Sequence, residues 1–195
     1  TATLAEATAT AAVRLFVQAA QRVQAGFQLT ETNLPAVLRI CQLVQGMPLG
    51  LELAAAYAGG VPLTAIADAV AQSAEFLAVD WRDLPARQRS MRAVFAWSWQ
   101  LLGAAEQRIL RQCAIFRGGF TYAAAQAVTG AIPALLARLV DTSLLQWQEH
   151  STGERRYSLH ELLRQFALEE LEAMGERALV EDRQGRYYLA YLAAR

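Results

Sequence analysis

Two short alternating segments flank a glycine-containing turn near the end of the chain: Leu144-Leu-Gln-Trp-Gln148, then Ser151-Thr-Gly153, then Arg155-Arg-Tyr-Ser-Leu159. Alternation on both sides of such a turn predicts a β-hairpin. Segments with helical periodicity precede it at residues 104–114, 122–128 and 132–141. Three helices followed by a two-stranded wing make a winged-helix domain, and this order decides the fold prediction for the second half of the chain.

The first half of the chain predicts a small helical bundle. Its first helix ends near Gly26 and has an apolar face made of Val13, Phe16, Val17 and Ala20. A second helix follows the Thr32/Asn33 cap, and Pro48 suits the first turn of a third. A short fourth helix runs from Pro62 to about Gln72. Short turns between such helices are typical of a bundle.

The predicted fold class is therefore mainly α, with three parts. A helical bundle occupies residues 1–80, and a winged-helix domain with a short β-hairpin wing and a following helix occupies 81–176. Residues 177–195 begin a C-terminal helix that carries Tyr187, Tyr188, Tyr191 and Leu192. We expect the joint between the two domains at Asp80–Pro85.

Composition excludes several functions. The 195 residues carry equal numbers of basic and acidic side chains, so no overall charge attracts nucleic acid or anionic lipid. Every basic residue is arginine, which removes Schiff-base chemistry and the phosphate-binding lysine of a P-loop. No apolar run approaches a membrane span, and no signal peptide is evident. We expect a cytoplasmic setting, and the start at Thr1 indicates a piece of a longer protein.

The sequence offers little from which to build a catalytic centre. Cys41 and Cys113 lie in apolar helical contexts, which favours buried thiols in a reducing compartment over a disulfide. The two histidines are His150, expected in the wing turn, and His160. No His or Cys pair has metal-ligand spacing, and no hydrolase, zinc-protease or dinucleotide motif occurs. We therefore predict no enzyme activity, no catalytic residue and no metal site in this chain.

Two stretches have a functional and a structural interpretation. The run Phe76-Leu-Ala-Val-Asp80 is similar to a magnesium-binding Walker B strand, but without a P-loop we favour an apolar connector capped by Asp80. The stretch Arg82–Arg92 is rich in arginine and either contacts a nucleotide phosphate or a neighbouring domain, or forms the solvated face of a helix. We favour the solvated face, with Met91, Phe95 and Trp99 buried on the other side.

A winged helix raises the question of DNA binding. The expected reading helix, Ile132–Asp141, offers Arg138 and otherwise apolar or acidic residues, whereas base readout needs Arg, Lys, Asn or Gln. Arg155 and Arg156 of the wing can touch phosphates, but two arginines give weak and non-specific affinity. We therefore do not expect base-specific reading, and DNA binding stays open as an alternative.

Three motifs follow one another along the chain. The first is Gly46-Met-Pro-Leu-Gly-Leu-Glu-Leu-Ala54, similar to a Gly-x-Pro-Leu-Ala motif. The second is the segment 87–102 with Phe116-Arg-Gly-Gly-Phe120, similar to the bridge into the winged helix. The third is Tyr157-Ser-Leu-His-Glu-Leu-Leu-Arg-Gln-Phe-Ala167, similar to a Met-His-Asp motif. In this order the three motifs resemble those of the STAND-class, NB-ARC-like signal-transduction ATPases, which include apoptosome ATPases, plant resistance proteins and bacterial transcriptional activators. The resemblance covers nearly the whole chain.

The resemblance implies a role in nucleotide-dependent switching. In such proteins the proline of the first motif packs near adenine and the histidine of the third contacts the β-phosphate of ADP. By motif match these residues are Pro48 and His160. Leu159 and Glu161 replace the usual Met and Asp, and the longer acid puts the aim of the histidine in doubt. The purely structural interpretations are that Pro48 only starts a helix and that His160 only caps one.

The expected function is a regulatory switch fragment with no cofactor of its own. ADP or ATP would be held in the parent protein by a nucleotide-binding domain of the same chain, with sensor repeats as a further partner and homo-oligomerisation on activation. The alternatives are a DNA-binding winged-helix module, and a protein-interaction scaffold in which the terminal aromatic helix docks a partner. No membrane partner is expected.

Overall fold

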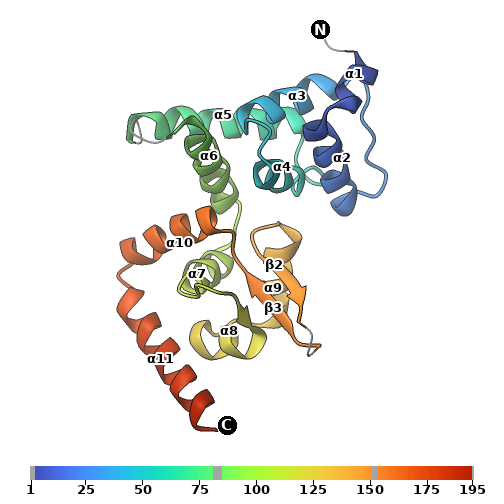
Figure 1. Cartoon of the computed structure of the whole chain (residues 1–195). Helices are drawn as coiled ribbons and strands as arrows, with labels where there is room; N and C mark the ends of the chain where they lie inside the picture. The colour runs from blue at the N-terminus through green and yellow to red at the C-terminus, as the bar shows by residue number, and fades with distance from the viewer. Residues whose placement is uncertain (1–2, 81–84, 151–152, 195) are drawn as a thin grey trace. The chain divides into compact units, whose positions relative to one another are not determined.

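The computed structural model describes residues 3–80, 85–150 and 153–194. By packing, the chain divides into two compact units, Thr1–Leu101 and Leu102–Arg195. Within the described residues the fold is mainly helical, with one three-stranded antiparallel sheet in the second unit (Figure 1). The predicted fold class, helical bundle followed by winged helix, is confirmed.

The first unit is helical. In chain order its helices are α1 (Leu4–Ala9), α2 (Ala11–Val23), α3 (Leu34–Leu43), α4 (Pro48–Ala55), α5 (Leu63–Asp80) and α6 (Ala86–Gln100). The apolar face predicted for the first helix is buried at Val13, Phe16 and Ala20 of α2, where it packs against α4. At Gly50 of α4, an added Cβ would lie 2.9 Å from the Val44 Cβ, so this glycine lets α4 approach the end of α3 closely.

The fourth helix is longer than predicted. It continues beyond Gln72 to Asp80, so the run 76–80 is helical, and its interpretation as a connector was wrong. Nothing between Gln72 and Asp80 breaks a helix, because Ala, Glu and Leu are good helix formers and neither Gly nor Pro occurs there. A helical run is also incompatible with a Walker B strand.

Helix α6 belongs to the first unit by packing, since it lies against α5 and α4. We expected this helix to open the winged-helix domain. Residues 81–84, including Arg82 and most of the expected joint, lie outside the described residues. A division by packing does not define a domain in the evolutionary sense, so the boundary at residues 80 and 81 stays a prediction.

The second unit has the element order of a winged helix. Its elements are α7 (Ala104–Cys113), β1 (Phe120–Thr121), α8 (Tyr122–Thr129), α9 (Pro133–Asp141), β2 (Gln146–Glu149), β3 (Arg155–Ser158), α10 (Glu161–Ala173) and α11 (Arg177–Ala193). The sheet order is β1-β3-β2, with Tyr157 paired to Phe120 on one side and to Trp147 on the other. The predicted hairpin is present, and β1 adds a third strand that the sequence did not predict.

Aromatic rings join the sheet to the helices of the second unit. Phe120 of β1 stacks on Tyr157 of β3 with ring centroids 5.9 Å apart, and Phe116 lies 4.7 Å from Phe120. Helix α10 packs on α7 and α11 on α8, while strands β2 and β3, which form the wing, lie on the other side (Figure 1). This core fixes the turn 117–119 against the base of the wing.

Both cysteines are free thiols, as predicted. Cys113 is buried and Cys41 half-buried, so full burial holds for Cys113 alone. Burial raises the pKa of Cys113 to about 12 and that of Cys41 to about 11. Neither thiol therefore ionises near neutral pH, which makes both poor nucleophiles.

Among the described residues, no single helix has the length and apolarity needed to cross a bilayer. Helices α8 and α9 meet that test only as a pair, and they are bent by 110°.

Candidate functional site

Pro48 occupies the first position of α4, as the sequence predicted. Its ring is exposed, and the preceding residue, Met47, has extended backbone. Proline is favoured at this position because the first amide of a helix has no intrahelical partner to lose. The helix-starting role is therefore observed, and a contact with adenine stays a prediction.

His160 is the N-cap of α10. Its Nδ1 accepts a hydrogen bond from the backbone N–H of Leu162 at 3.3 Å. With Nδ1 as acceptor, a neutral imidazole carries its proton on Nε2, so Nε2 is the atom that can donate to a ligand. The side chain is exposed at the end of β3, and contact with a phosphate stays a prediction.

Glu161 stands where the resembled motif has Asp, and it pairs within its own helix. Arg164 donates from Nε to Glu161 Oε2 at 2.8 Å and from Nη2 to Oε1 at 2.7 Å. These bonds with Arg164 are the main cause that lowers the pKa of Glu161 to about 2. The Glu161 side chain thus bonds Arg164, which lies further along α10. The backbone N–H of Leu162 donates to His160.

Pro48 and His160 belong to different compact units. Each has the local role at a helix start that the sequence predicted. The common nucleotide site between them stays a prediction.

Helix α9, the expected reading helix, presents little that can read a base. Its exposed positions include Pro133, Ala134 and Ala137. Arg138 is exposed, but its Nε is held 2.7 Å from Oε1 of Glu106, a nearly buried residue of α7. The one cation of the helix is therefore paired with an acid, which agrees with the expectation that α9 does not read sequence.

The two wing arginines differ in their surroundings. The guanidinium of Arg155 lies over the ring of Trp147, 4.5 Å from its centroid. Arg156 donates from Nη2 to the carbonyl oxygens of Gly118 and Gly119, at 3.4 and 3.2 Å. Adjacent strand residues point to opposite faces of a sheet, so the two cations serve opposite faces of the wing.

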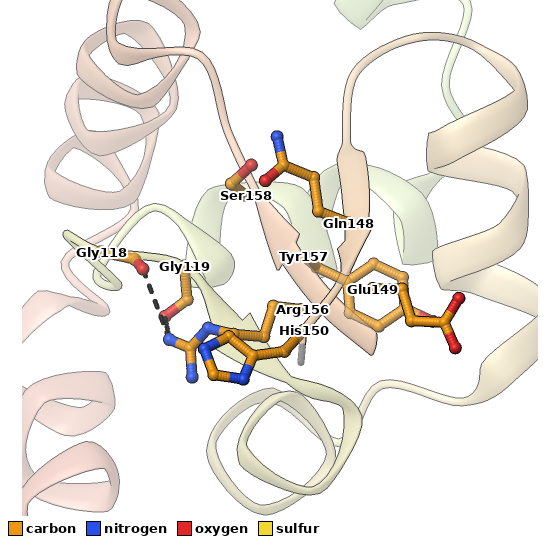
Figure 2. Close-up of a pocket in the computed structure, with 8 residues that line it drawn as sticks. All are labelled: Gly118, Gly119, Gln148, Glu149, His150, Arg156, Tyr157 and Ser158. Carbon is orange, nitrogen blue, oxygen red and sulfur yellow. Dashed lines mark hydrogen bonds between the residues drawn. The ribbon is translucent and has the colours of Figure 1, made fainter. Parts of the chain in front are cut away.

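A cavity of about 230 Å³ lies beside Arg156. The turn supplies Gly118 and Gly119, and the wing supplies residues 148–150 and 156–158 (Figure 2). We call it the wing pocket. Reasoning from the sequence singled out Arg156 but missed the pocket, although strand alternation was a usable signal: Gln148 pairs with Arg156, which places both side chains on one face with Ser158.

The arginine stretch before α6 agrees in part with the solvated-face interpretation. Arg87 is exposed, whereas Arg89 and Arg92 are half-buried and each has an interaction partner. On the other side Met91 and Phe95 are buried, but Trp99 is only half-buried. The solvated face of α6 is thus narrower than predicted, because Arg89 and Arg92 are half-buried.

The described residues contain no group of three His, Cys, Asp or Glu side chains placed to hold a metal ion. The terminal helix α11 leaves several large apolar side chains in solvent, Leu189 at 71% and Leu192 at 67% exposure. Its role as a docking helix stays a prediction.

Comparison with known proteins finds no matching family model. The chain is 38% identical over 190 residues, 94% of its length, to proteins of Mycobacterium tuberculosis and Mycobacterium bovis whose provisional name is HTH-type transcriptional regulator. It is 31% identical over 185 residues to an uncharacterized protein of Mycobacterium tuberculosis. The chain spans about a fifth (21%) of the length of the proteins named as regulators and 47% of the length of the uncharacterized protein. It is therefore similar to a segment of longer mycobacterial proteins named as transcriptional regulators, while the STAND class rests on the motif resemblance alone.

Proposed function

We propose that this chain is the helical and winged-helix module of a transcriptional regulator, and that its winged helix contacts DNA. The observation that carries the proposal is the similarity over 94% of the chain to proteins named as HTH-type regulators, together with the winged-helix element order. These names favour the DNA-binding alternative over the nucleotide switch. Because the match covers about a fifth of those relatives (21%), it does not assign the HTH of their name to this segment.

The chemistry of the unit favours backbone contact over base readout. Helix α9 exposes small and apolar side chains, and Arg138 is paired with Glu106. The wing offers Arg156, whose described partners are neutral carbonyls. Contacts of this kind give affinities of about 10⁻⁴ to 10⁻⁶ M that fall with salt and depend little on sequence.

Fluorescence anisotropy with a labelled random duplex, at salt near 50 mM and again near 200 mM, tests the proposal. We expect weak binding that declines with salt and is nearly the same for unrelated duplexes. Arg138→Gln should leave the affinity within about twofold, because α9 is not the contacting surface. An absence of binding at the lower salt concentration would contradict DNA contact by this module.

A second candidate, the nucleotide-state switch, is supported by one specific observation. The Pro48 and His160 motifs both lie at helix starts, as the resemblance requires, and the His160 ring can present Nε2–H to an anion. In this candidate ADP, held by a nucleotide-binding domain of the parent chain, touches both residues and favours a closed state. A ligand shifts such an equilibrium only by its differential contacts with the two states.

The switch is tested in the full-length parent protein with His160→Ala. We expect a loss of ADP affinity and a raised basal activity, since one contact made only in the closed state disappears. Pro48→Ala should weaken ADP binding without changing the charge of the site. ADP affinity unchanged in both variants would remove this candidate and leave DNA contact untouched.

A further inference from the structure

The two faces of the wing differ in chemistry. Register places Gln146, Gln148, Arg156 and Ser158 on one face, because Gln146 pairs with Ser158 and Gln148 with Arg156. The other face carries Trp147 with Arg155 stacked on it, and Tyr157 stacked on Phe120. The first face is therefore made of hydrogen-bond donors, and the second joins the aromatic core.

The wing pocket opens beside this donor face. Figure 2 shows the Arg156 guanidinium at Gly118 and Gly119, with Gln148 and Ser158 further along the strands, and His150 lines the same pocket. Glu149 also borders the pocket, but its carboxylate points away from Arg156 and His150 in the same view. The pocket thus presents the Arg156 guanidinium beside the two carbonyl oxygens that it bonds, and the guanidinium is the group that suits an oxyanion.

In the part of the chain that the structure describes, the hydrogen bonds of the Arg156 guanidinium go to neutral acceptors. Two carbonyl oxygens of the 118–119 turn accept from Nη2 of Arg156, and neither carries a formal charge. By contrast, the carboxylate of Glu106 neutralises Arg138. A guanidinium fixed by neutral acceptors loses less side-chain entropy on binding and keeps its charge for the ligand.

The turn that holds Arg156 is itself fixed. Gly119 has φ +82°, and a Cβ there would come 2.8 Å from the carbonyl oxygen of Tyr157. The backbone of the turn therefore lies directly against β3, next to Arg156. The pocket wall and its cation belong to one rigid corner of the sheet.

We infer that the wing pocket binds a phosphate group through Arg156, and that this is where the module holds the DNA backbone. The DNA part of this inference rests on the proposed function. It assigns the contact to one face of the wing, so that Arg156 matters and its neighbour Arg155 does not.

Arg155 provides a matched control, because Arg155→Gln and Arg156→Gln each remove one positive charge from adjacent residues of one strand. At about 50 mM salt we expect Arg156→Gln to lower duplex affinity about tenfold and to reduce the salt slope by about one. Arg155→Gln should change the affinity by less than about twofold. Arg156→Lys should recover part of the loss, since it keeps the charge without the guanidinium fork.

Equal losses in both glutamine variants would overturn the assignment, because net charge alone would then explain them. Circular dichroism of each variant confirms that the fold is intact.

Titration with inorganic phosphate, followed by ¹H–¹⁵N NMR of the whole chain, separates the pocket from the proposed function. Shifts confined to the amides of Gly118, Gly119 and His150, and lost in Arg156→Gln, support the pocket. If such shifts occur while the duplex does not bind, DNA contact fails and the phosphate site stands. If the duplex binds and phosphate moves no resonance of the pocket, the site is wrong and DNA is held elsewhere. If neither ligand acts, both proposals fail.

Discussion

At the scale of single residues, Gly119 occupies a position where any side chain would strain the backbone. Its φ of +82° is rare for any other residue, and an added Cβ would meet the Tyr157 carbonyl at 2.8 Å. We predict that Gly119→Ala destabilises the second unit by about 1–3 kcal/mol, the usual cost of a strained backbone. Hydrogen exchange at β3 amides measures the loss locally. Gly118→Ala is the control, because nothing lies within 4 Å of a Cβ there, and an equal loss in both variants would refute the strain.

The sequence predicted residues better where their role is local. Pro48 and His160 stand at helix starts as expected, since these positions follow from the order of neighbouring residues. The partners of Arg156 are the carbonyls of Gly118 and Gly119, which lie 38 and 37 positions away along the chain. No spacing rule predicts such a contact, because it requires β1 to pair with β3. That is why the wing pocket emerged only from the folded chain.

At the scale of elements, a partly buried ion pair ties α11 to α7. Arg111 of α7 donates to both carboxylate oxygens of Glu176, the N-cap of α11, at 3.3 and 2.7 Å, and Gln112 adds a third bond at 2.8 Å. We predict that Glu176→Gln costs about 1–3 kcal/mol at neutral pH, because the largely buried Arg111 loses its charged partner. Glu181→Gln, in the exposed pair with Arg177, should cost clearly less, because solvent screens that pair. Urea unfolding of both variants provides the comparison.

The same ion pair predicts a dependence on pH. The bond from Arg111 is the main cause that lowers the pKa of Glu176 below its ordinary value of 4.5. A carboxylate with a lowered pKa in the folded state stabilises the fold above its unfolded pKa, and this contribution is lost as pH falls through the folded pKa. The difference in unfolding free energy between the wild type and Glu176→Gln should therefore shrink as pH falls below about 4.5. A constant difference from neutral pH to about pH 3 would show that the bond lacks this role.

Element boundaries show where reasoning from the sequence fails. Apolar periodicity predicted the helices. Helix α5 continues to Asp80 because no Gly or Pro interrupts it, although the apolar run 76–80 also fits the sequence pattern of a strand or a connector. Strand β1 has only two residues, Phe120 and Thr121, too few for any alternation to be visible. It forms because the turn 117–119 places Phe120 beside one edge of β3, where the two strands can pair. Tertiary pairing, not local pattern, created it.

At the scale of the whole molecule, the motifs of the resemblance are divided between the two units. Pro48 belongs to the first and His160 to the second, and both side chains are exposed. The DNA-contact proposal, by contrast, needs only the second unit. The nucleotide switch therefore needs residues of both units, whereas DNA contact needs the second unit alone. A ligand that engages both units discriminates between the two functions.

That difference leads to a prediction for ADP. Each exposed residue offers little alone: one proline ring and one Nε2–H donor give at most two weak contacts, and the two halves of the site would have to be ordered together. Such a site lacks the several convergent polar groups that small-ligand sites use. We predict that this chain alone binds ADP no more tightly than about 1 mM by calorimetry, a free energy near 4 kcal/mol. Micromolar binding that His160→Ala abolishes would contradict this expectation, because this chain by itself would then hold a complete nucleotide site. If that binding survived His160→Ala but fell in Arg156→Gln, the nucleotide would be occupying the wing pocket through its phosphates.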